Sequence, residues 1–111
     1  MLSQHIGPFT CEVRRENGQA VVSPRGELDM ATMGAVDQEL RELRRAGVAH
    51  ILLDLGGLTF MDSSGLHLIT KWVSEASKDG FQLELEPGPA PVQRIFHLTA
   101  MHDSLPWKKH D

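Results

Sequence analysis

Short apolar runs alternate along this chain with longer amphipathic segments, and this alternation constrains the fold more than any other feature. Residues 50–55 are almost all apolar in a run too short for a typical helix, as in a central strand covered on both faces. Segments with apolar residues at spacings of three and four precede and follow this run. Strands that alternate with helices need crossover connections, which give a parallel sheet with helices packed on it. The order therefore predicts an α/β fold.

The N-terminal part of the chain is typical of a hairpin followed by a helix. Residues 9–13 alternate apolar and polar side chains, and residues 20–23 form a second short run. The Asn17-Gly18 pair between them favours a tight turn, because both residues tolerate a positive φ angle. An amphipathic helix follows, with Asp29 or Thr32 as its expected N-cap.

The rest of the chain repeats the alternation of helix and strand. A loop is expected over residues 56–62, and apolar residues within 66–76 predict a second helix. Gly47 and Gly80 stand where the two helices are expected to end. Residues 81–86 alternate apolar and polar side chains, as in a strand with one face in water, and Pro91 can begin a short third helix. We therefore expect a small mixed sheet, with an N-terminal hairpin followed by parallel strands alternating with helices. One domain should span residues 1–111, with its core at about 8–107.

Composition argues against several classes of function. The 111 residues carry 11 Lys and Arg against 15 Asp and Glu, a net charge of −4, so we expect no direct contact with nucleic acid. Cys11 is the single cysteine, which excludes an intramolecular disulfide and favours a reducing, cytoplasmic location. The apolar runs are too short for a signal peptide or for membrane insertion. The six histidines lack a paired ligand spacing, so we expect no metal and no other cofactor.

The most informative segment lies before the second helix, where Asp62, Ser63 and Ser64 stand in a row. Each of the three could cap the helix, because a side-chain oxygen there accepts a hydrogen bond from a free backbone amide. A helix needs only one N-cap residue, so capping does not explain the presence of the other two. Hydroxyls at a helix N-terminus also lie where free amides and the macrodipole stabilise added negative charge. Simple capping and a phosphorylated or anion-contacting serine both fit the residues alone.

Four segments resemble, in their order and spacing, the signatures of the STAS family, and the similarity is strongest to its bacterial anti-sigma factor antagonist branch. They are Gly26-Glu27-Leu28-Asp29, Asp54-Leu55, Leu58-Thr59-Phe60-Met61-Asp62-Ser63-Ser64-Gly65-Leu66 and Phe96-His97-Leu98-Thr99. The resemblance implies a STAS-like fold and a partner-switching regulator of transcription that is not an enzyme. Its unphosphorylated form would bind an ATP-using anti-sigma factor serine kinase and so release a sigma factor. Phosphorylation would end the binding, and a serine phosphatase would restore it.

The same resemblance assigns roles to individual residues. Ser63 would be phosphorylated, Asp29 and Asp62 would belong to the kinase-facing site, and Ser64 would be the helix-capping neighbour. The predicted partner-binding surface comprises Asp29, Met61, Asp62, Ser63, Ser64, Gly65 and His67. His67 stands where the family commonly has a small residue, so it either alters this surface or is a solvated helix residue. The adjacent Phe60 and Met61 leave two alternatives open: one packs beneath the loop while the other faces a partner, or both are buried.

Two alternatives belong to other classes of function. In the first, the chain is a non-switching STAS scaffold or a subunit of a transport complex, and Ser63 only caps a helix. In the second, Ser63 or Ser64 is the nucleophile of a hydrolase. A hydrolase would need a positioned base and an oxyanion hole, and residues 61–65 do not match Gly-x-Ser-x-Gly.

In the partner-switching prediction, a phosphoserine adds about −1.5 to −2 charges, which are favourable at a helix N-terminus. The phosphate should therefore leave its own domain folded and weaken the binding of the partner.

Overall fold

The computed structural model describes residues 8–109, which form five strands, three α-helices and a short 3-10 helix. The strands are β1 (Thr10–Glu16), β2 (Gln19–Leu28), β3 (His50–Asp54), β4 (Leu58–Met61) and β5 (Gln82–Glu86). The helices are α1 (Met33–Arg45), α2 (Ser63–Asp79) and α3 (Ala90–Leu98), followed by the 3-10 helix η1 (His102–Ser104). Apart from β4, this order matches the predicted alternation.

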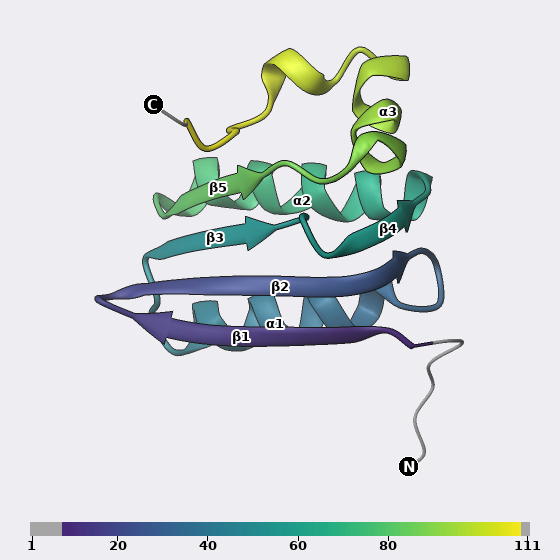
Figure 1. Ribbon diagram of the computed structural model, residues 1–111. Coiled ribbons are helices and arrows are strands. Elements are labelled where there is room, and N and C mark those ends of the chain that lie inside the picture. Colours follow the sequence, from purple (N-terminus) through teal and green to yellow (C-terminus); the bar gives the residue numbers. More distant parts are fainter. Residues whose placement is uncertain (1–7, 110–111) are drawn as a thin grey trace.

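A mixed sheet runs through the molecule in the order β1-β2-β3-β5, and β4 pairs with the far end of β2 (Figure 1). β1 and β2 are antiparallel, and the turn between them holds Asn17 and Gly18 at φ angles of 53° and 79°, as their sequence predicts. The other strand pairs are parallel, as crossover connections require. The predicted small mixed α/β fold is confirmed.

The sequence predicts a loop over residues 56–62, and this prediction is wrong for the four residues of β4. They pair with the end of β2 from Gly26 to Leu28, after a register shift between Gly26 and Glu27. β2 is long enough to pair with β3 along its first half and with β4 near its end (Figure 1). The sheet therefore continues to the point where α2 begins.

α1 and α2 pack on the same face of the sheet, behind it in Figure 1, and the core lies between these helices and the strands. Ile51 and Leu53 belong to this core, whereas Leu52 points to the opposite face beside its register partner Val21. Within residues 8–109 no helix covers that opposite face. Residues 51–53 are nevertheless all buried, with Leu52 only 8% exposed, so the expectation of a central strand covered on both faces is confirmed, although no helix provides the second cover.

A buried carboxylate joins α1 to α2. Asp37 Oδ1 accepts hydrogen bonds from Trp72 Nε1 and Lys71 Nζ, both at 2.8 Å, and Asp37 Oδ2 accepts from the Arg41 guanidinium. Burial alone would raise the pKa of Asp37, but the hydrogen bonds from Lys71, Trp72 and Arg41 outweigh burial and hold the pKa below its ordinary value. The cluster fixes the packing of α2 against α1.

The C-terminal segment covers the end of β5 and ties α3 to the sheet. The Leu85 N–H donates to the Pro106 carbonyl at 2.9 Å, and the Lys108 N–H donates to the Leu85 carbonyl at 2.7 Å. Trp107 then packs edge-on against Phe96, with 5.0 Å between the ring centroids. These contacts hold α3 beside β4, next to the N-terminus of α2.

Candidate functional site at the N-terminus of helix α2

The predicted site residues Asp29 and Asp62 lie at the same edge of the sheet because the strands before them are parallel neighbours. Leu28 ends β2 and Met61 ends β4, and these two residues are partners in the register. Asp29 and Asp62 follow directly, and the Asp62 N–H donates to the Leu28 carbonyl at 3.2 Å. The carboxyl ends of parallel strands are the usual location of a binding site in such sheets. Both acidic residues therefore lie at the same edge, as the sequence predicts.

Asp62 is the N-cap of α2. Its backbone is extended, with φ −108° and ψ −168°, and its Oδ1 accepts a hydrogen bond from the Ser64 N–H at 2.8 Å. The Asp62 carbonyl then accepts the first helical bonds, from Gly65 N at 3.1 Å and Leu66 N at 3.3 Å. The expectation that Ser64 is the capping residue is wrong, because Ser64 donates its amide to the cap.

Ser63 is the first residue of α2 and is exposed. Within residues 8–109 its hydroxyl has no hydrogen-bond partner, so both lone pairs and the proton of Oγ are available. The capping role that the scaffold alternative gave to Ser63 is wrong, since Asp62 fills that position, but a scaffold function itself stays an alternative. The Ser63 side chain makes no hydrogen bond within the described fold.

Asp29 organises the turn between β2 and α1. Its Oδ1 accepts hydrogen bonds from the Ala31 N–H at 3.0 Å and the Thr32 N–H at 3.2 Å. Thr32 is 2% exposed, and its hydroxyl donates to the Glu27 carbonyl at 2.7 Å while accepting from the Asp29 N–H at 3.0 Å. Thr32 occupies the N-cap position of α1 but makes no side-chain cap bond. Asp29 instead accepts hydrogen bonds from the backbone N–H groups that precede the helix. Sequence reasoning missed this bracing role of Thr32.

Two residues of the predicted partner-binding surface are buried instead. Met61 is 3% exposed and packs in the core, and Gly65 is also buried. A Cβ atom on Gly65 would lie 2.9 Å from Met61 Sδ and 3.0 Å from Leu28 Cδ2, so only glycine lets α2 approach β4 this closely. Met61 and Gly65 therefore support the loop from beneath, and Phe60 is the member of the Phe60-Met61 pair that faces solvent.

Exposed apolar side chains surround this end of the molecule. Met30 is 80% exposed after β2, Phe60 is 43% exposed on β4, and Leu98 is 76% exposed at the end of α3. Phe60 and Leu98 line a groove of about 370 Å³ together with Met61, Pro91, Arg94 and Ile95. No sequence pattern separates Phe60 from Met61, because both are apolar and adjacent.

A smaller hollow lies beside the first two turns of α2, next to Ser63. It measures about 220 Å³ and is lined by Ser63, Leu66, His67, Thr70 and Met101. His67 is exposed and stands one helical turn after Ser63. The structure thus brings His67 to the same hollow as Ser63, where the sequence left its role open.

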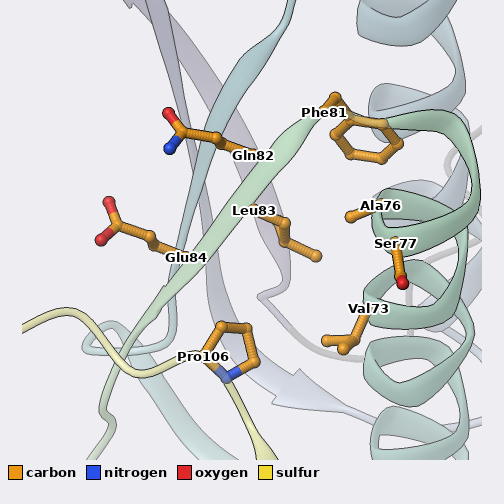
Figure 2. A pocket seen from close by; sticks show the side chains of 8 residues that line it. All are labelled: Val73, Ala76, Ser77, Phe81, Gln82, Leu83, Glu84 and Pro106. Atoms are coloured by element: carbon orange, nitrogen blue, oxygen red, sulfur yellow. The ribbon is translucent and has the colours of Figure 1, made fainter.

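Figure 2 shows another hollow, of about 280 Å³, between α2 and β5. Val73 and Ala76 of α2 face Leu83 of β5 across it, whereas Gln82 and Glu84 point away from the helix. Its facing walls are apolar, and it lies more than two turns along α2 from Ser63. It contributes nothing to the chemistry at the helix N-terminus.

Within residues 8–109, neither Cys11 nor the potential metal ligands form a second reactive centre. Burial, with a smaller contribution from the charge of Glu39, raises the pKa of the Cys11 thiol to about 12, so Cys11 stays a protonated packing residue. In the part of the chain that the structure describes, no three potential metal ligands come together. No helix between residues 8 and 109 combines the length and the apolar character needed to cross a membrane.

This fold and site define a class of small α/β domains that present a serine at the start of a helix. Residues 10–110 match the STAS domain model, and the chain belongs to the STAS domain family. An anti-sigma F factor antagonist from Paenibacillus polymyxa is 30% identical over 96 residues, which cover 86% of this chain and 82% of the relative. An anti-sigma factor antagonist from Mycobacterium paratuberculosis has a similar structure, with a TM-score of 0.80 and 25% identity over 93% of this chain and 87% of that one. The unphosphorylated form of the anti-sigma factor antagonist SpoIIAA shares the fold, with a TM-score of 0.72 and 20% identity over 85% and 84% of the two chains.

Proposed function

We propose that this protein is an anti-sigma factor antagonist that works by partner switching. Its unphosphorylated form binds an anti-sigma factor that is also a serine kinase, and this binding releases a sigma factor. Phosphorylation of Ser63 ends the binding, and a serine phosphatase restores it. The anti-sigma factor antagonists among its relatives support the general role. The observation that carries the assignment to Ser63 is its exposed hydroxyl, which no hydrogen bond engages within residues 8–109.

In the proposed modification the protein is the substrate and not the enzyme. The Ser63 Oγ forms a bond to the γ-phosphorus of ATP, the bond between that phosphorus and the β–γ bridging oxygen breaks, and ADP leaves. The hydroxyl proton passes to a base on the kinase or to solvent. The partner supplies the nucleotide site and the catalytic groups. Because ATP is the phosphoryl donor and the lone Cys11 is a free thiol, we place this exchange in the cytoplasm.

The surroundings of Ser63 support a surface that binds another protein. The exposed Met30, Phe60 and Leu98 provide apolar area around the two carboxylates, and exposed apolar groups of this kind are typical of protein interfaces. Asp29 and Asp62 add negative charge beside Ser63. A basic rim on the kinase would complement these carboxylates.

A phosphate on Ser63 would change this surface without unfolding the domain. It would add about −1.5 to −2 charges next to free amides at the start of α2, where negative charge is favourable. The Asp62 cap would remain in place, because its bond to the Ser64 amide does not involve Ser63. The unfavourable effect therefore falls on the complex, where the new charge meets the nucleotide phosphates that Ser63 must approach to be modified.

The test is phosphorylation with ATP by candidate anti-sigma factor kinases from the same genome, followed by mass-spectrometric location of the phosphate. Ser63→Ala should still bind the kinase but resist phosphorylation, and Ser63→Asp should bind more weakly. Ser64→Ala is the matched control and should be modified at Ser63. Phosphorylation of Ser63→Ala at the wild-type rate would refute the assignment. Binding without modification by any of these kinases would instead favour the non-switching scaffold.

A further inference from the structure

His67 lies close enough to Ser63 to contact a group bound to the Ser63 hydroxyl oxygen. The two residues are four apart on α2, so their side chains lie on the same face of the helix, with about 5–6 Å between Cβ atoms. Both are exposed, and both line the hollow of about 220 Å³. The other residues that line it are Leu66, Thr70 and Met101, so His67 supplies its titratable group.

The charged groups of neighbouring elements are engaged elsewhere. Lys71, one turn beyond His67, donates to Asp37 at 2.8 Å, and the Asp62 carboxylate accepts from the Ser64 amide. On the segment beyond Met101, the His102 ring stacks on His97, with 4.3 Å between the ring centroids, and its Nδ1 lies 3.2 Å from Asp103 Oδ1. Arg94 of α3 lines the separate groove beside Phe60.

We infer that protonated His67 is the counter-ion of the phosphate on Ser63, so that the phosphorylated state of this domain responds to pH near neutrality. This inference rests on the proposed phosphorylation of Ser63. The imidazolium donates an N–H to a phosphate oxygen across one helical turn, a charge-assisted bond that neutral imidazole makes less strongly. His67 acts as a positioning residue, which holds the phosphate over the hollow and draws it away from the carboxylate of Asp62.

The pairing between His67 and the phosphate can be measured from the titration of either group, because the two protonation equilibria are linked. The phosphate dianion favours the charged imidazole, and the charged imidazole favours the phosphate dianion, by the same coupling free energy. An i, i+4 charge pair of this kind should move each titration midpoint by about 0.15–0.4 pH units, upward for the imidazole and downward for the phosphate. Below the phosphate midpoint the monoanion pairs more weakly, and above the His67 midpoint the imidazole is neutral. The pairing is therefore strongest in the window between the two midpoints.

The experiment uses the full chain with phosphoserine incorporated genetically at position 63, so that it needs no kinase. Proton–carbon NMR follows the imidazole of His67, with His50 on the sheet as an internal control, and phosphorus NMR follows the phosphate. We expect the His67 midpoint to rise on phosphorylation while that of His50 stays fixed. We also expect the phosphate midpoint to be higher in His67→Gln than in wild type. Equal midpoints in the two proteins, or a His67 midpoint unmoved by phosphorylation, would overturn the inference. Failure of every kinase to modify Ser63 would count against the proposed function alone.

Discussion

Replacing Asp37 by alanine should destabilise the fold by about 2–4 kcal/mol. The Asp37 side chain is 10% exposed, and its removal would leave the buried Trp72 indole N–H without the acceptor that it now has at 2.8 Å. An orphaned buried donor costs about 1–3 kcal/mol. The Lys71 and Arg41 side chains are 49% and 55% exposed and can return to water, so each lost ion pair adds only about 0.2–1 kcal/mol.

Urea and thermal unfolding at pH 7, followed by circular dichroism, would measure this effect. For a domain of this size the loss corresponds to a decrease in Tm of roughly 8–20 °C. Asp37→Asn keeps an oxygen acceptor for Trp72 and should lose about half as much free energy of unfolding. Glu42→Ala removes an exposed ion pair to Arg45 on the same helix and should change stability by less than about 0.5 kcal/mol. An Asp37→Ala protein within about 0.5 kcal/mol of wild type would refute the reasoning.

Three further predictions concern acid stability, close packing and capping. Because the pKa of Asp37 is lowered on folding, its contribution is complete above the unfolded-state pKa of about 3.9 and is lost as the pH falls through the folded-state pKa. Urea titrations should therefore show a larger loss of stability between pH 5 and pH 3 in wild type than in Asp37→Asn. Gly65→Ala should destabilise by about 1–3 kcal/mol, because its Cβ would overlap Met61 and Leu28. Gly34→Ala, whose Cβ would meet nothing within 4 Å, is the control and should be neutral or stabilising in the same denaturation assay. Asp62→Ala should lose about 1 kcal/mol with the N-cap, whereas Ser63→Ala should change the free energy of unfolding by less than about 0.5 kcal/mol.

Periodicity was sufficient to predict the three α-helices and every strand except β4 within residues 8–109, and the failure at β4 has a local cause. β4 has four residues with the burial order buried, exposed, exposed, buried, which matches neither an alternating strand nor a helix. Gly26 and Glu27 of β2 are adjacent, whereas their partners Leu58 and Phe60 are separated by Thr59, which is an extra residue in β4. This extra residue interrupts the alternation of buried and exposed side chains within residues 58–61, and the partner strand that defines it lies some 30 residues away in the chain.

The site was predictable as a segment but not atom by atom. Asp62, Ser63 and Ser64 have similar capping preferences, so only the backbone at the end of β4 determines that Asp62 is the cap. The bond from Trp72 to Asp37 joins residues 35 positions apart. Asp37 looks from the sequence like an ordinary acidic residue in the first half of α1, and its buried role depends on how α2 packs beside it.

The capping geometry separates the stability of the fold from the proposed switch. If Ser63 were the cap, a phosphate on Oγ would disturb the helix start, and the modification would act on the domain itself. With Asp62 as the cap, a phosphate on Ser63 would leave the cap bond intact and would change only the exposed surface. That surface already combines two carboxylates with the exposed Phe60 and Met30. A partner that covers these apolar groups would also remove water from the added charge, and this desolvation makes binding less favourable. A single modification can therefore oppose binding without any conformational change in this domain.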